Sequence, residues 1–192
     1  MAERHIRIEL KDIISPDHSV LVVWDVQNML VNRIFNKEAF ITNLEKVIAG
    51  ARKAGVPIFF TKITPLPEKF ESSMRFASRR GFSQMSPDML DLYLKPKEGD
   101  ITLNKNTANI FLGTNFEMMI RNAGVESIVF TGISTEIGIE SSARDSSNRG
   151  FYTVVVEDAV SSPDKEAHER SLLNMARLVN VRKSSEILEI WK

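Results

Sequence analysis

Residues 20–25 read VLVVWD, five apolar residues followed by an aspartate, and this stretch decides the fold class. A short apolar run without alternation is typical of a strand that is buried on both faces of a sheet. Further along, apolar residues recur at helical spacing over 39–54, Gly55 follows as a stop signal, and 58–61 read IFFT. Strand, helix and strand in this order predict a βαβ unit.

The same alternation continues along the rest of the chain. We expect strands over 101–104, 127–133, 152–158 and near Val181, and helices over 116–123, 137–148 and 164–179. Because parallel strands need helical crossovers, this order predicts a mainly parallel, Rossmann-like α/β sheet with helices on both faces, in three αβα layers. A chain of 192 residues is expected to form one domain, 1–192.

Residues 62–99 interrupt the alternation and are rich in Pro, Met and Phe. Connections longer than about 12 to 15 residues are usually lids over a site or surfaces for a partner, although two short core helices would also fit this stretch. Its apolar side chains could close a lid or form an interface between subunits: Phe70, Met74, Phe76, Phe82 and Met85.

Composition excludes several function classes. The 25 basic and 25 acidic side chains give zero net charge, which removes a general attraction to nucleic acid, and the absence of Cys excludes a disulfide framework and a thiol nucleophile. No phosphate-cradling glycine motif is present, and His5, His18 and His168 are dispersed, so we expect no cofactor and no metal site. The charged N-terminus is unlike a signal peptide, and no apolar run approaches a membrane span, so a cytoplasmic location is expected.

In parallel sheets, ligands bind at the carboxyl ends of the strands, where Asp25, Lys105 and the segment 131–138 are expected to converge. A buried Asp25 would need a hydrogen bond, a cation such as Lys105, or a proton, and a readily protonated Asp is a general acid or base. Taken singly, Asp25 could be a turn residue and Lys105 a solvated lysine. Gly138 begins a predicted helix, where backbone N–H groups could form half of an oxyanion pocket or the glycine could serve close packing.

These segments resemble the isochorismatase-like hydrolase superfamily, which includes cysteine hydrolases such as nicotinamidases and N-carbamoylsarcosine amidases. The resemblance runs from about residue 19 to 181 and rests on motifs in the family's order. The motifs are LVVWDVQN around Asp25, LNKNTANIF around Lys105, TGISTEIGIESSARDS from Thr131, VVEDAVSS from Val155, and His168.

The resemblance implies a catalytic role for Asp25 and Lys105. In the family's cysteine hydrolases, Asp, Lys and Cys form the triad, and the Cys position falls on Gly138, which cannot form an acyl-enzyme intermediate. Ser141 and Ser142 lie further along and are poor substitutes. The family's isochorismatases also carry Gly here and cleave a vinyl ether with the Asp as general acid, so the resemblance implies that Asp25 protonates the substrate while Lys105 orients it.

Two positions depart from the isochorismatase pattern. An aromatic residue and a Gln are usual there, whereas this chain has Ser134 and Ile63. The STE and ESSARD segments look like those of the amidase-type cysteine hydrolases, so the chain resembles an amidase scaffold without its nucleophile. The family also implies an oxyanion site at Ser134 and Gly138, with a cis peptide bond between Ile133 and Ser134.

Two functions therefore remain open. One is the hydrolysis of isochorismate or a similar vinyl ether without a covalent intermediate. The other is a catalytically silent, amidase-like protein that binds a small molecule or a partner chain, with Gly138 either natural or engineered. Because family members often form dimers or tetramers, the resemblance also implies a homo-oligomer.

Overall fold

A parallel sheet forms the middle layer of the molecule. The computed structural model describes residues 6–71, 73–74 and 86–192. In this part of the chain the sheet has six strands in the order β3-β2-β1-β4-β5-β6, and every neighbouring pair is parallel. The strands are β1 (Ser19–Trp24), β2 (Ile58–Ile63), β3 (Ile101–Lys105), β4 (Ser127–Ile133), β5 (Tyr152–Ser161) and β6 (Asn180–Arg182). The predicted Rossmann-like three-layer fold is confirmed.

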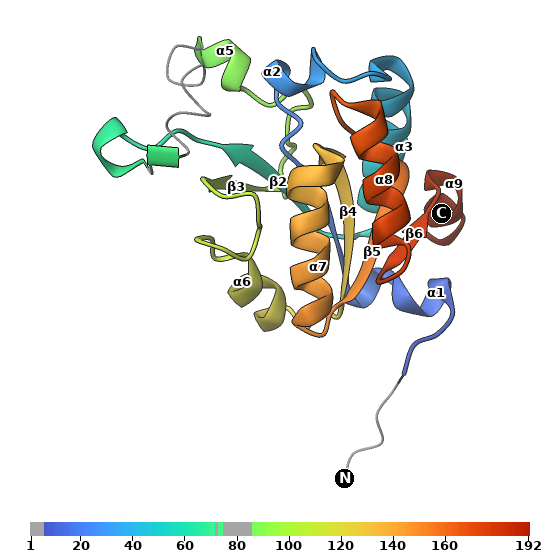
Figure 1. Cartoon of the computed structure of the whole chain (residues 1–192). Helices are drawn as coiled ribbons and strands as arrows, with labels where there is room; N and C mark the ends of the chain where they lie inside the picture. The colour runs from blue at the N-terminus through green and yellow to red at the C-terminus, as the bar shows by residue number, and fades with distance from the viewer. Residues whose placement is uncertain (1–5, 72, 75–85) are drawn as a thin grey trace.

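Helices cover both faces of this sheet, as Figure 1 shows. The helices α1 (Leu10–Ile13), α3 (Lys37–Ala54) and α9 (Ser184–Ile190) contribute to the core on one face, and α6 (Phe116–Asn122), α7 (Glu140–Asn148) and α8 (Lys165–Met175) to the core on the other. All six residues of β1 are buried, which explains the unbroken apolar run that the sequence shows there. Helix α3 ends at Ala54, and the residue that caps it, Gly55, has a positive φ of 76° that suits a residue without a side chain.

Some element boundaries differ from those predicted. The predicted helix over 137–148 consists of a π-helical turn, η3 (Thr135–Ile139), followed by α7, and the helix predicted to end at residue 179 ends at Met175. The short helices α1 and α9 were not predicted, because four- and seven-residue segments carry too little periodicity.

Part of the insertion over 62–99 is tied to the segment that follows β1. The side-chain amide of Gln27 donates to the carbonyls of Ile63 at 3.2 Å and Leu90 at 2.5 Å, while its oxygen accepts from the Ile63 N–H at 2.9 Å. Asn28 N–H also donates to Asp91 O. The short elements of this region are η1 (Pro16–His18), α2 (Asn28–Val31), η2 (Glu68–Phe70) and α5 (Pro87–Leu90).

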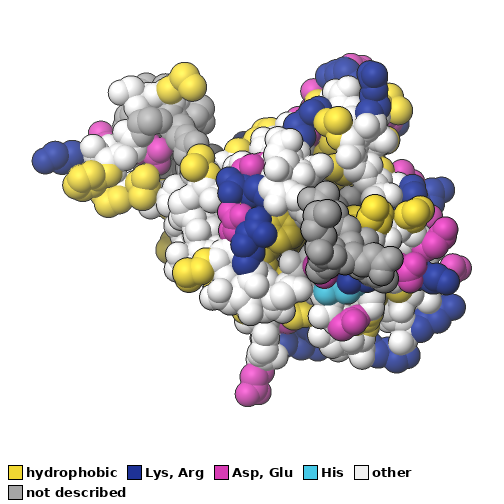
Figure 2. Space-filling view, turned by 90° about the horizontal axis from the view of Figure 1, so that it is seen from below, with side chains coloured by type: hydrophobic (Ala, Val, Ile, Leu, Met, Phe, Trp, Pro, Cys, Tyr) yellow, Lys and Arg dark blue, Asp and Glu magenta, His cyan; other side chains and the backbone are white. Residues whose placement is uncertain are grey.

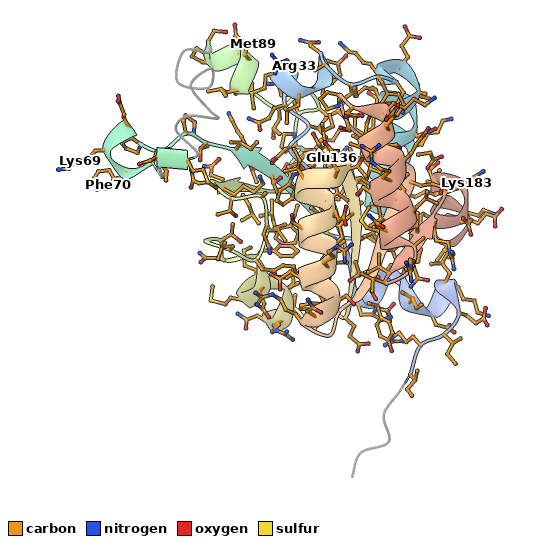
Figure 3. The ribbon with its side chains drawn as sticks, in the orientation of Figure 1. Arg33, Lys69, Phe70, Met89, Glu136 and Lys183 are labelled. Atoms are coloured by element: carbon orange, nitrogen blue, oxygen red, sulfur yellow. The ribbon has the colours of Figure 1, made fainter. Side chains whose placement is uncertain are left out.

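The first half of the insertion projects from the body as an arm, which we define as residues 64–71 (Figure 1). Figure 2 shows hydrophobic side chains gathered on this projection, and Figure 3 shows Phe70 and Lys69 at its outer end. Phe70 is 71% exposed and Met74, just beyond, is 85% exposed. The proposed contact residues Phe76, Phe82 and Met85 lie outside the described residues.

Candidate active site

Four neighbouring strands bring the predicted residues to one cavity. Asp25 follows β1, Lys105 ends β3 and Ser134 follows β4, and β3, β2, β1 and β4 are adjacent in the sheet. A cavity of about 300 Å³ opens at these strand ends. It is lined by Trp24, Asp25, Leu30, Ile63, Lys105, Thr107, Ala108, Ile133, Ser134, Ile137 and Gly138. The predicted site residues therefore share one cavity.

Asp25 and Lys105 form a buried ion pair at this cavity. Lys105 Nζ lies 2.6 Å from Asp25 Oδ2, and the side chains are only 1% and 2% exposed. Lys105 Nζ also donates to the carbonyl of Thr107 at 3.1 Å. Because a buried charge is costly unless it is paired and hydrogen-bonded, each of the two charged groups offsets the cost of burying the other.

Thr61 on β2 holds the second carboxylate oxygen of Asp25. Its hydroxyl accepts from the Asp25 backbone N–H at 3.0 Å and lies 2.6 Å from Oδ1. Asp25 has a φ of 47°, in the left-handed region that few residues other than glycine adopt. Such a conformation persists where surrounding contacts enforce it, and Thr61 and Lys105 supply them.

Gly138 lines the cavity beside Trp24, and the tryptophan occupies the space next to it. A Cβ built on Gly138 would lie less than 3.0 Å from three atoms of the Trp24 indole, Nε1, Cε2 and Cζ2. Gly132 on β4 is equally constrained, because a Cβ there would overlap the Trp24 backbone. The two glycines thus make room for Trp24, one for its ring and the other for its main chain.

The backbone donors of the predicted oxyanion site differ in availability. The peptide bond between Ile133 and Ser134 is cis, as expected from the family resemblance. The Gly138 N–H donates to the Ser134 carbonyl at 3.1 Å, inside the π-helical turn. The Ser134 N–H has no acceptor among the described residues. An oxyanion would therefore have to compete for the Gly138 N–H, whereas no acceptor in the described part of the chain competes for the Ser134 N–H.

A second polar cluster lies behind the turn η3. His168 Nδ1 is 2.8 Å from Thr135 Oγ1, and Phe35 contacts the imidazole edge-on. Burial lowers the pKa of His168, and the carboxylates of Glu136 and Glu169 offset part of that shift. Glu136 lies in η3, just before α7 (Figure 3), and accepts a hydrogen bond from the Ser162 hydroxyl. This cluster supports the turn that carries Ser134 and Gly138.

Sequence reasoning identified the charged pair but missed Trp24 and Thr61. Trp24 lies in a buried apolar run, where a core position explains it fully, and Thr61 is one of many threonines in strands. The only signal for Trp24 in the sequence was its position directly before Asp25 at the end of the strand. Within the described residues, no cluster of three metal-ligating side chains occurs, and no helix is long and apolar enough to span a membrane.

The parallel sheet defines an α/β protein whose strand-end cavity holds an acidic and a basic residue among mostly apolar side chains. A model of the isochorismatase domain matches residues 19–186. The chain therefore belongs to the isochorismatase family of hydrolases.

Named relatives agree with this assignment. The chain is 29% identical over 177 residues to the uncharacterized isochorismatase family protein YecD of Escherichia coli O157:H7, covering 88% of this chain and 94% of YecD. It is 26% identical over 188 residues to the ureidoacrylate amidohydrolase RutB of Enterobacter sp. (strain 638), covering 83% and 82%.

A solved structure shows the same fold. A cysteine hydrolase from Pseudomonas syringae pv. phaseolicola 1448A has a TM-score of 0.86 to this chain at 17% identity, over 100% of this chain and 98% of that one.

Proposed function

We propose that the protein hydrolyses a small vinyl ether such as isochorismate without a covalent intermediate. The observation that carries this proposal is a cavity that pairs Asp25 with Lys105 but has neither a nucleophile at Gly138 nor room for one. Covalent hydrolysis requires a nucleophile within reach of the scissile bond. Acid-catalysed hydrolysis requires only a positioned proton donor and water.

In the proposed reaction, Asp25 in its acid form donates a proton to the enol carbon of the substrate. The π electrons of the C=C bond form the new C–H bond, and the positive charge remains on an oxocarbenium group. Water adds to the oxygen-bearing carbon of this oxocarbenium group and returns a proton to the Asp25 carboxylate. The resulting hemiketal then collapses to a ketone and an alcohol.

Lys105 acts in this scheme as the positioning residue for Asp25. In the resting site, the ammonium and the Thr61 hydroxyl both stabilise the carboxylate. The acid form arises when a proton passes from Lys105 Nζ to Oδ2 across their 2.6 Å hydrogen bond, which leaves both groups uncharged. A substrate that fills the cavity, which Leu30 and Ile137 line, favours the uncharged pair, because burial disfavours charge.

Amide hydrolysis, the reaction in the name of RutB, has less support in this chain. Ser141 and Ser142, the serines that follow Gly138 on α7, do not line the cavity. Ser142 is buried and accepts a hydrogen bond from the Ile110 N–H at 3.2 Å, and Ser141 is exposed. Neither Ser141 nor Ser142 is therefore placed to act in place of the missing thiol.

A catalytically silent protein that binds a small molecule or a partner is the second candidate. The absence of a nucleophile favours it, because relatives of this chain include an amidohydrolase and a cysteine hydrolase. On this hypothesis the buried pair of Asp25 and Lys105 would bind a ligand and turn nothing over.

The test compares the wild type with Asp25→Asn on isochorismate, ureidoacrylate, nicotinamide and N-carbamoyl amino acids. We expect isochorismate cleavage that falls at least about 100-fold in Asp25→Asn, since Asn cannot donate the proton. Asp12→Asn, at an exposed position of α1, is the matched control and should retain full activity. Unchanged turnover by Asp25→Asn would refute the acid role. Silence of the wild type on every substrate would favour the second candidate.

A further inference from the structure

The two tryptophans of this chain are buried in different ways. Trp191 is 1% exposed, and its Nε1–H donates to the carbonyl of Ile14 at 2.8 Å. Trp24 is equally buried, but its Nε1–H has no acceptor among the described residues. A buried indole N–H normally finds a partner. Because Trp24 lines the cavity, a ligand there is within the range of its donor.

Contacts on several sides hold the Trp24 ring in place. Lys105 Nζ lies 3.8 Å from the ring centroid, which is a cation–π contact. Gly138 lies against the edge that carries Nε1, and Gly132 against the Trp24 backbone. A donor held this firmly contributes to binding without losing much side-chain freedom.

The donor occupies a particular place in the cavity. Nε1 is one of the atoms that a Cβ on Gly138 would overlap, so it lies where a side chain from residue 138 would begin. In the proposed function, residue 138 supplies no nucleophile at that position. The indole therefore presents a hydrogen-bond donor where a catalytic side chain would otherwise face the substrate.

We propose that Trp24 is a ligand-contacting residue whose Nε1–H binds a carboxylate oxygen of a small organic acid. Two donors of this cavity, the Trp24 Nε1–H and the Ser134 N–H, lack acceptors among the described residues. Donors without acceptors favour a ligand that accepts, and an anionic oxygen accepts most strongly. The apolar side chains of Leu30, Ile63 and Ile137 contact the remainder of the acid.

This inference deepens the proposed function, because it names a carboxylate as part of the substrate that Asp25 protonates. It shares the cavity with that function but needs no turnover. It also holds for a silent binding protein, so the two proposals can fail separately.

The experiment follows the fluorescence of Trp24 alone. Since the chain has two tryptophans, the variant Trp191→Phe leaves Trp24 as its single indole. The probe is sodium benzoate, with benzyl alcohol as the neutral control of similar shape. We expect a saturable change in Trp24 emission with millimolar benzoate and a much weaker response to benzyl alcohol. The absence of a saturable response to benzoate would overturn the proposal.

A second variant removes the donor and keeps the ring. Trp24→Phe retains an aromatic face for Lys105, so calorimetric titration should show benzoate binding weakened roughly 10-fold or more, which is the value of one charge-assisted hydrogen bond. Equal affinity in Trp24→Phe and wild type would overturn the proposal. The melting temperature of each variant verifies that it is folded.

Turnover by Asp25→Asn separates the two proposals. If Asp25→Asn still cleaves isochorismate while Trp24→Phe binds benzoate weakly, the acid mechanism fails and the Trp24 contact stands. If Asp25→Asn is inactive while Trp24→Phe binds benzoate normally, the Trp24 contact fails and the mechanism stands.

Discussion

Trp24 and Asp25 are consecutive residues at the end of β1, and Lys105 contacts both. Its ammonium group lies 2.6 Å from Asp25 Oδ2 and 3.8 Å from the centroid of the Trp24 ring. At the scale of single residues, the cavity therefore combines a buried ion pair with an aromatic ring. A change at any of the three is expected to affect the other two, because residues in contact are energetically coupled.

His168 gives a pH prediction at the same scale. Burial lowers its pKa below the ordinary value of 6.5, so the folded protein binds a proton there less readily than the unfolded chain. The contribution of His168 to the free energy of unfolding is therefore fully present above pH 6.5 and is lost as the pH falls below that value. Chemical denaturation of His168→Gln between pH 7 and pH 5 should show a smaller decline than the wild type. An identical decline in both proteins would contradict this prediction.

The charged residues of the site were predictable because strand ends in a parallel sheet are where ligands bind. In the printed sequence, Asp25 directly follows the apolar run 20–24, and Lys105 directly follows the predicted strand over 101–104. Trp24 was not predictable as a site residue, because its role depends on the close approach of Gly138 across the sheet. Such proximity follows from tertiary packing and leaves no local pattern.

At the scale of elements, Gln27 connects the end of β2 to the segment around α5. Its side chain is completely buried and makes three hydrogen bonds to the backbone of Ile63 and Leu90. Gln27→Leu would leave those backbone groups without partners, at a cost of about 3 kcal/mol in unfolding free energy. We expect faster amide hydrogen exchange over residues 86–93 in this variant.

Asn28→Ala is the matched control for the loss of the Gln27 hydrogen bonds. Asn28 is exposed at its amide, which donates to the Asp88 carbonyl, so its loss should cost well under 1 kcal/mol. Equal exchange rates over 86–93 in Gln27→Leu and the wild type would show that Gln27 does not hold the segment.

The elements that could be predicted are those with a long repeating pattern. Helix α3 shows its apolar residues at helical spacing over four turns, and β1 and β4 contain the apolar runs 20–24 and 128–130. The π-helical turn η3 could not be predicted, because its five residues follow neither strand nor helix periodicity. Its position depends on the hydrogen bonds that the Ser134 carbonyl accepts from three successive N–H groups of the turn.

At the scale of the whole molecule, the exposed arm predicts association between copies of the chain. Phe70 exposes most of its ring on this projection, away from the body (Figure 3). We expect light scattering to give the mass of a dimer or tetramer and Phe70→Asp to shift it toward the 21.7 kDa of one chain. Lys69→Gln is the neighbouring control and should leave the mass unchanged. A monomeric wild type would contradict this prediction.

The arrangement of the sheet was predictable because strands and helices alternate and their connections are constrained. A strand that is followed by a helical crossover must pair in parallel, which yields the observed three layers. The path of residues 62–99 was not predictable, because their prolines and scattered apolar residues specify no repeating element.

The Trp24 indole fills the place that a side chain at residue 138 would occupy. A double-mutant cycle in thermal unfolding tests it most directly, with Gly138→Ala, Trp24→Val and the double variant. Gly138→Ala alone should cost about 1 to 3 kcal/mol because it overpacks the site, which lowers the melting temperature by roughly 2 to 4 °C per kcal/mol. In the Trp24→Val background the same change should be neutral or stabilising, since Ala favours helical backbone over Gly. An equal loss in both backgrounds would show that residue 138 and the Trp24 indole do not compete for the same space.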